Sequence, residues 1–439
     1  MRPPFSIASH VSTAYHVGNR MLAGAMPPGC HTKGAVMETG SSLWGSSPYK
    51  PFPCVSGDIA LSRQARSLWG KSDGGEGACW LPLYMHMLDS AGIAGCLWDK
   101  WLPEGTRALF VRALGGDPCY ARKLACFIAG IHDIGKATPS CQGMPCGKGG
   151  FTLDHKPRKA GLTFRPEVTG HRRVSHPMGS YLVLLDILVR DYGWQAACAE
   201  SIAAVVGGHH GKPPAGEDDP VKIRAEVMPQ VYGLGWDKGC AEAWTAVQVE
   251  LVTLVALAAG LTHEELAGFA NTFVPAPVAS LLTGYVIMAD WLASDQTLFP
   301  LVSNGYDDEG EDDRDLRMQP STWDDVSRQV AGAWQRAGLI PAWHEDAVPN
   351  VPIDDLYRNR FGFSESMRPR PMQRAAVEVA RSVEKPGLMI IEAPMGEGKT
   401  EAALAAAEIL AARTGRGGIC VALPTMATTD AMFGRVHRW

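Results

Sequence analysis

Histidine and aspartate side chains recur at the ends of apolar stretches in this chain of 439 residues. The stretch "GIHDIGK" (130–136) places His132 next to Asp133, and the same residue types occur in other apolar contexts: His86, His176, the doublet His209 and His210, and Asp290. A single His-Asp pair is usually structural, but several such side chains are costly to bury without partners. Imidazole nitrogens and carboxylate oxygens together suit Fe²⁺, Mn²⁺, Ni²⁺ or Co²⁺. We therefore expect these residues to converge on divalent transition metal ions.

The order of these residues carries a family resemblance. One histidine, a His-Asp pair, another histidine, a histidine doublet and a final aspartate resemble the HD phosphohydrolase superfamily in its two-metal form. More narrowly, the segments "SLWGKS" (67–72), "HHGKP" (209–213) and "ADWLASD" (289–295) resemble the nuclease domain of the CRISPR type I effector nuclease–helicase, which the Cascade surveillance complex recruits. The resemblance covers about residues 60–439.

The resemblance implies two metal ions with Asp133 as the bridging ligand. The other implied ligands divide into two sets, with His86, His132 and Asp290 at one ion and His176, His209 and His210 at the other. Lys136, three residues after Asp133, would neutralise a phosphate oxygen, although a lysine after a glycine turn can also be simply exposed. Two ions about 3.5–4 Å apart can activate a water and stabilise the leaving oxygen of a phosphodiester.

The stretch "APMGEGKT" (393–400) reads as a nucleotide-phosphate loop. It keeps Gly396, Gly398, Lys399 and Thr400 of the phosphate-loop pattern but begins with Ala393 where the strict pattern has glycine. Backbone N–H groups at the start of the following helix would hold the phosphates. Lys399 would reach the β and γ oxygens, and Thr400 would bind Mg²⁺.

The motifs around this loop resemble those of superfamily 2 helicases. Gln373 in "RPMQ" matches the adenine-reading glutamine, and Pro424, Thr425 and Thr428 in "LPTMATTDAMFGRV" match residues that would touch a DNA backbone. No DExH carboxylate pair follows within residues 401–439. We therefore expect this chain to bind ATP and Mg²⁺ weakly if at all, not to turn ATP over by itself, and to need a separate fragment for unwinding.

Helical periodicity dominates the part of the chain that carries the histidines. Apolar residues recur at helical spacing in residues 80–101, 119–130, 175–193, 195–211, 261–272 and 276–295, which predicts an all-α bundle. No apolar run reaches the length of about 18 residues that a membrane span needs, so we expect no membrane attachment.

The pattern along the chain predicts four regions. Residues 1–58 are rich in Ser, Gly and Pro and are expected to be a poorly ordered extension, and residues 59–302 form the HD nuclease domain. Residues 303–350 are expected to be an acidic linker with a bridging helix at 321–339. Residues 351–439 would be an incomplete first RecA-like domain, with strands at 387–392 and 417–423 around a helix at 399–413.

Charge and cysteine usage add weaker constraints. The net charge is −5, but residues 307–315 hold seven acids, and residues 147–175 hold seven Lys or Arg against two acids. The basic stretch could line a DNA path or be a solvated loop. Eleven cysteines without a CxxC pair, and an N-terminus without a secretory signal, predict free thiols in the cytoplasm.

The resemblance, together with these patterns, implies a metal-dependent nuclease that cuts single-stranded DNA in type I CRISPR interference. One alternative is an HD phosphohydrolase that acts on small nucleotides. Another is a non-catalytic remnant or docking module that binds the Cascade-type surveillance complex without cutting DNA.

Overall fold

The computed structural model describes residues 51–73, 79–146, 152–163, 174–213, 230–233, 239–303, 320–339 and 351–439. Residues 1–50 and the acidic stretch 307–315 lie outside the described residues, as does much of the basic stretch 147–175. The predictions made for those segments stay predictions.

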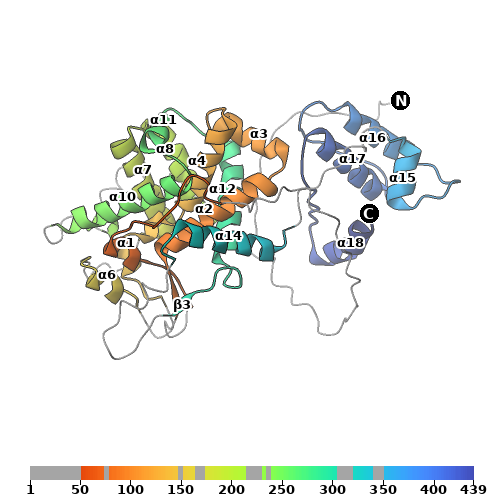
Figure 1. The fold of residues 1–439 in the computed structure, drawn as a ribbon. Helices are drawn as coiled ribbons and strands as arrows, with labels where there is room; N and C mark the ends of the chain where they lie inside the picture. Colours follow the sequence, from red (N-terminus) through yellow and green to blue (C-terminus); the bar gives the residue numbers. More distant parts are fainter. Residues whose placement is uncertain are drawn as a thin grey trace. The chain divides into compact units, whose positions relative to one another are not determined.

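Within the described residues, six helices form the core of the domain that carries the candidate ligands (Figure 1). They are α2 (Leu83–Lys100), α4 (Pro118–Gly130), α7 (His176–Tyr192), α8 (Ala196–Gly207), α10 (Cys240–Ala258) and α12 (Ala276–Ser294). Shorter or peripheral helices join them: α1 (Arg63–Ser67), α3 (Glu104–Ala113), η1 (Ile134–Lys136), α5 (Pro139–Gln142), α6 (His155–Lys159), α11 (His263–Gly268) and α14 (Trp323–Ala337).

Helix α2 lies at the centre of this domain. Every residue from Leu83 to Trp98 is buried, as expected of a helix that is covered on all sides. α4, α10, α12 and α14 all pack on it. The end of α4 comes especially close, because a Cβ on Gly130 would lie 2.8 Å from the Ala91 side chain of α2 and 2.7 Å from Val255 of α10. This close approach fixes the turn that follows α4, which contains His132 and Asp133.

Most of the predicted helices of this domain are confirmed, with small shifts at their ends. Residues 119–130, 175–193, 195–211 and 276–295 correspond to α4, α7, α8 and α12, and a shorter α11 lies within 261–272. Helices α3 and α10 were not predicted. The sequence of α10 is rich in Val and Thr, which favour strands when considered alone, but its apolar residues are buried against α2 and α4.

A small antiparallel sheet shows that the prediction of an all-α domain was wrong in one respect. Its strands are β1 (Trp69–Ser72), β2 (Cys79–Pro82) and β3 (Val302–Ser303), in the order β1-β2-β3. The strands are too short to show an alternating pattern, and the helix predicted at 80–101 includes most of β2. β2 runs directly into α2, and β3 follows α12. The pairing of β2 with β3 therefore connects the start of α2 to the segment after α12.

The boundaries predicted for the extension and the linker also need correction. Phe52 is buried against the Trp323 ring of α14, with ring centroids 5.8 Å apart. Ile59 donates a backbone hydrogen bond to Ser321 at 2.7 Å. The predicted helix at 321–339 is confirmed as α14, and Val330 on its apolar face packs at Gly92 of α2. Residues 51–58 and α14 are therefore parts of the helical domain.

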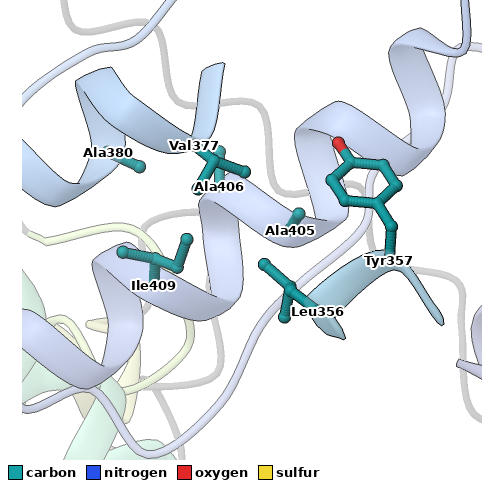
Figure 2. Close-up of a cluster of buried hydrophobic side chains, with 7 residues drawn as sticks. All are labelled: Leu356, Tyr357, Val377, Ala380, Ala405, Ala406 and Ile409. Carbon is teal, nitrogen blue, oxygen red and sulfur yellow. The ribbon is translucent and has the colours of Figure 1, made fainter. Parts of the chain in front are cut away.

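Four helices make up the described part of the C-terminal region: α15 (Ile353–Phe361), α16 (Pro371–Ser382), α17 (Lys399–Arg413) and α18 (Met426–Arg438). The predicted helix at 399–413 is confirmed as α17. Figure 2 shows the small core that α15, α16 and α17 share, formed by Leu356, Tyr357, Val377, Ala380, Ala405, Ala406 and Ile409. A buried carboxylate, Glu408, pairs with Arg360 at 2.6 Å and joins α17 to α15.

The strands predicted at 387–392 and 417–423 are not formed, so the described residues do not contain the expected beginning of a RecA-like parallel sheet. Leu388 and Ile390 are 75% and 66% exposed. A strand needs a neighbouring strand to pair its backbone N–H and C=O groups and to cover its apolar side chains. The apolar composition of these segments favours strands. It does not by itself provide the neighbouring strands with which they would have to pair.

Two helices, α10 and α12, are long and apolar enough to cross a membrane by length and composition, although no membrane span was predicted. Core helices of globular domains pass the same test, and half of the α10 window and a third of the α12 window are buried. Both helices pack on α2, and α12 carries the candidate ligand Asp290. Every cysteine in the described residues is a free thiol, as predicted.

Candidate metal centre

The residues predicted for the first ion meet inside the helical domain. His86 comes from α2, His132 and Asp133 from the turn after α4, and Asp290 from α12, and all four side chains are buried. One ligand atom from each lies within 4.8 Å of the others. Asp290 Oδ1 is 3.2 Å from His86 Nε2 and 3.3 Å from His132 Nε2.

The residues predicted for the second ion form an adjacent cluster. His176 is the first residue of α7, and His209 and His210 follow the end of α8. Because α7 and α8 pack together, these two helix ends bring the three imidazoles within 4.8 Å of one another. The Nε2 atoms of His176 and His210 are 3.1 Å apart. His210 is exposed and His209 is buried, so the second cluster borders solvent.

The carboxylate of Asp133 lies between the two clusters. Its Oδ2 is 3.3 Å from His86 Nε2 and 3.5 Å from His132 Nε2. Its Oδ1 is 3.6 Å from the Nε2 atoms of both His176 and His209. Each oxygen thus faces one cluster, which is the arrangement that a bridging carboxylate requires.

Backbone carbonyls orient two of the imidazoles. His132 Nδ1 is 2.8 Å from Ala129 O at the end of α4, and His209 Nδ1 is 2.7 Å from Val206 O at the end of α8. Carbonyls in the last turn of a helix have no partner within the helix and readily accept such hydrogen bonds. With Nδ1–H donating to a carbonyl, the lone pair of Nε2 points into the centre, as is common for metal-bound histidines.

Several buried polar atoms of this centre have no hydrogen-bond partner. They include the Nε2 atoms of His86, His132 and His209. Buried polar atoms in proteins almost always have a partner, and a metal ion is one such partner. The unpaired atoms and the mix of nitrogen and oxygen donors therefore fit divalent metal ions.

The electrostatics of the centre set the protonation states of its ligands. Burial lowers the pKa of His176 to about 4 and that of His209 to about 3, so both imidazoles are neutral near pH 7. Burial opposes ionisation of Asp133, but Lys136 and His132 outweigh it and hold the pKa of this carboxyl well below its usual range. Burial also acts to lower the pKa of His132, but Asp133 and Asp290 raise it to about 9. Metal binding would therefore release a proton from His132.

Lys136 is buried and lies inside the centre. Its Nζ forms an ion pair with Asp133 Oδ2 at 2.8 Å and donates a hydrogen bond to Gly70 O at 2.8 Å. The simple alternative, an exposed lysine after a glycine turn, is therefore excluded. In this arrangement Lys136 positions the carboxylate of Asp133, and its ammonium is not exposed to a phosphate group.

Two polar residues near Asp290 were not among the predicted site residues. Lys71 Nζ lies 3.4 Å from Asp290 Oδ1, and Ser294 Oγ donates to the same oxygen at 2.8 Å. Ser294 lies four residues after Asp290 on α12, so helical spacing could have indicated it. Lys71 lies in the quoted segment "SLWGKS", but its approach to a residue 219 positions away depends on the sheet that was missed.

The predicted nucleotide loop forms a separate candidate site. Gly396 and Gly398 adopt φ values of +83° and +76°, in the left-handed region that favours glycine. Lys399 Nζ donates to Pro394 O at 3.0 Å, so the ammonium folds back onto the loop. Thr400 follows Lys399 in the first turn of α17. The loop therefore lies at the start of a helix, as predicted for phosphate binding.

The other predicted helicase residues have local structural roles. Gln373 is buried, accepts a hydrogen bond from Arg370 N at 2.9 Å and donates to Gly398 O at 3.2 Å. Both ends of its amide are therefore used within the protein. Thr425 caps α18 by accepting from Thr428 N at 3.3 Å. Pro424, Thr425 and Thr428 are exposed, so their contact with DNA stays a prediction.

Comparisons with known proteins identify a family for the helical domain. The family described as "Cas3, HD domain" matches residues 69–299, a range that contains all the candidate metal ligands. The CRISPR-associated nuclease/helicase Cas3 of Streptococcus thermophilus is 30% identical over 82% of this chain and 36% of its own length. The CRISPR-associated endonuclease/helicase Cas3 of Thermus thermophilus is 31% identical over 86% of this chain and 36% of its own length. The chain thus spans a little over a third of these relatives.

Solved structures that match this chain are also CRISPR-associated proteins. A structure titled "Crystal structure of CRISPR-associated protein" matches with a TM-score of 0.65 and 31% identity, covering 87% of this chain and 38% of that one. The ATP-bound Cas3 of T. fusca matches with a TM-score of 0.57 and 25% identity, covering 85% and 37% of the two chains. Because the family match extends over more than half of the residues and includes the whole candidate centre, this chain belongs to the Cas3 HD domain family.

Proposed function

We propose that this chain is a metal-dependent nuclease that hydrolyses phosphodiester bonds of single-stranded DNA in type I CRISPR interference. The observation that carries the proposal is the position of Asp133, whose two carboxylate oxygens each face one of two ligand clusters. Paired divalent ions of this kind serve phosphodiester hydrolysis in many nucleases. The curated relatives, which are named as nucleases and helicases, support the same reaction class.

The protein's own residues have distinct parts in this proposal. His86, His132, Asp133 and Asp290 would hold one ion, and His176, His209 and His210 would hold the other with Asp133. Divalent ions bound there would supply a water of lowered pKa and positive charge beside the scissile phosphate. Fe²⁺, Mn²⁺, Ni²⁺ and Co²⁺ all suit the donor set.

The shape of the centre indicates how substrate reaches it. The first cluster is buried, and the second borders solvent at His176 and His210. A polynucleotide would therefore approach from the side of the second cluster. Lys136 keeps the Asp133 carboxylate ionised and in place between the clusters.

The proposed partners follow from the relatives. A chain in a structure titled "CRISPR RNA-guided surveillance complex, pre-nicking" matches with a TM-score of 0.50 and 25% identity. We infer that this protein acts with a Cascade-type surveillance complex in the cytoplasm. The loop at Lys399 and Thr400 would bind the phosphates of ATP together with Mg²⁺.

Cleavage of circular single-stranded DNA tests the proposal. Purified protein loaded with Mn²⁺, Ni²⁺ or Fe²⁺ should nick and degrade the circle, and EDTA should stop the reaction. Asp133→Ala should abolish cleavage, because it removes a ligand from both clusters. His263→Ala is a matched control, because His263 lies on α11 and stacks on Tyr192 rather than joining either cluster.

Small nucleotides in the same assay distinguish the main alternative. Hydrolysis of deoxynucleoside triphosphates or cyclic nucleotides without cleavage of DNA would replace the nuclease with a small-molecule phosphohydrolase. A protein that holds both ions yet leaves every substrate intact would favour a non-catalytic docking role and overturn the proposal.

A further inference from the structure

Lys71 approaches the metal centre from the small sheet. Its Nζ lies 3.4 Å from Asp290 Oδ1, near the outer limit for a hydrogen bond. The Lys71 side chain is 28% exposed, whereas the Lys136 side chain is 9% exposed. The two lysines therefore reach the same cluster of carboxylates from different environments, one open to solvent and one enclosed.

The enclosed Lys136 also has more hydrogen-bond partners than the more exposed Lys71. Lys136 already has close partners in Asp133 and Gly70, each at 2.8 Å. Lys71 has only its long contact with Asp290 within the part of the chain that the structure describes. An ammonium group carries three N–H donors, so most of the donor capacity of Lys71 remains for another partner.

The backbone of Lys71 is held rigidly although its side chain is partly free. Trp69 N donates to Gln142 Oε1 at 3.1 Å, and Gln142 Nε2 donates to Trp69 O at 2.9 Å. Ser72 Oγ donates to Cys146 O at 2.6 Å. Strand β1 is thus fixed on both sides of Lys71, which places the long, flexible side chain reproducibly at the edge of the first cluster.

We propose that Lys71 binds a phosphate of the DNA strand beside the first cluster, the role that the sequence assigned to Lys136. The inference rests on the proposed nuclease function and identifies one substrate contact within it. A divalent ion held by Asp290 would compete with Lys71 for the negative charge of that carboxylate. The ammonium would then be available to an anionic phosphate, for which a flexible lysine is a common partner.

The test compares Lys71→Ala, Lys71→Arg and the control Lys100→Ala with the unmodified chain. Lys100 is exposed at the far end of α2, about 21 Å from His86 along the helix. Four measurements are made on each protein: steady-state kcat and KM for a single-stranded oligonucleotide with Mn²⁺, binding of a non-hydrolysable form of the same oligonucleotide with Mn²⁺ by fluorescence anisotropy, the salt dependence of that binding, and the Mn²⁺ content per chain.

Lys71→Ala should raise KM and weaken DNA binding by about 10-fold, the effect expected for one lost charge-assisted contact. The slope of log K against log salt concentration should become shallower by about 0.7, as for one lost phosphate contact on single-stranded DNA. Mn²⁺ content should be unchanged, and Lys71→Arg should restore most of the binding. Lys100→Ala should match the unmodified chain in all four measurements.

Two results would overturn the inference. Unchanged KM, binding and salt slope in Lys71→Ala would show that Lys71 does not contact the strand. A fall in Mn²⁺ content with unchanged DNA binding would show that Lys71 only supports Asp290. If the unmodified chain itself does not cut the oligonucleotide, the proposed nuclease function fails, and this outcome is distinguishable because it does not depend on any Lys71 variant.

Discussion

Gly135→Ala should separate the two ligand clusters. Gly135 lies in η1, two residues after Asp133, where η1 crosses the start of α7. A Cβ at this position would lie 2.1 Å from His176 O, 2.3 Å from Ser180 N and 2.7 Å from the carbonyl carbon of Gly179. Real Cβ atoms essentially never come within 3.0 Å of another heavy atom, and backbone atoms cannot turn aside.

The required displacement is large compared with the tolerance of a metal site. Moving His176 O from 2.1 Å to an acceptable distance needs a backbone shift of about 1 Å, while metal–ligand distances tolerate only about 0.2 Å. The shift should occur in α7. Buried hydrogen bonds hold the η1 segment, from Gln142 Nε2 to Lys136 O and from Gln248 Nε2 to Ala137 O, each at 2.8 Å. His176 would then move away from Asp133.

Metal analysis measures this effect. The Gly135→Ala protein should keep the ion of the buried first cluster and lose most of the second, so Mn²⁺ content after dialysis should fall from two ions per chain toward one. DNA cleavage should fall by about 100-fold, the scale expected for a 1 Å misplacement in an active site. The free energy of unfolding should fall by about 1–3 kcal/mol from overpacking.

Gly284→Ala is the matched control. Gly284 is exposed on α12, and a Cβ there would meet nothing within 4 Å. This variant should keep both ions and should be as stable as the unmodified chain or slightly more stable, because alanine favours helix. Retention of both ions and full activity by Gly135→Ala would refute the reasoning from the crossing of η1 and α7.

Two further predictions concern buried charges. Burial raises the pKa of Asp89 well above 3.8, and its Oδ2 has no hydrogen-bond partner. The neutral form of Asp89 therefore contributes stability that is fully present below pH 3.8. This contribution is lost as the pH rises through the raised pKa. Asp89→Asn should therefore gain in Tm relative to the unmodified chain between pH 5 and pH 8, and a constant difference would contradict this. Arg360→Ala should leave Glu408 without its ion-pair partner and destabilise the α15–α17 unit by about 3 kcal/mol. Hydrogen exchange in α17 would show this, and unchanged protection would count against it.

The candidate ligands could be predicted because their chemistry is visible residue by residue. Histidine and aspartate side chains in apolar helices need partners. The order of these residues along the chain indicates the HD phosphohydrolase superfamily. The structure places all seven predicted ligands in two adjacent clusters around Asp133. Their binding of metal ions remains a prediction.

The contacts that support the ligands could not be predicted in the same way. The approach of Lys71 to Asp290 joins positions 219 residues apart and depends on a short sheet without a clear sequence pattern. The same limit explains the error at 387–392, where an apolar run indicated a strand but its hydrogen-bonding partners were lacking. Lys136 was placed near the correct atoms, but its enclosure by Gly70 and Asp133 was visible only in the fold.

The proposed chemistry depends on two ions that Asp133 joins. Anomalous scattering from a crystal of the Mn²⁺-loaded protein measures the number and positions of these ions most directly. We predict two peaks about 3.5–4 Å apart, one beside each carboxylate oxygen of Asp133. The first should lie among His86, His132 and Asp290, and the second among the other three imidazoles. A single peak, or two peaks that Asp133 does not join, would contradict a two-ion nuclease centre.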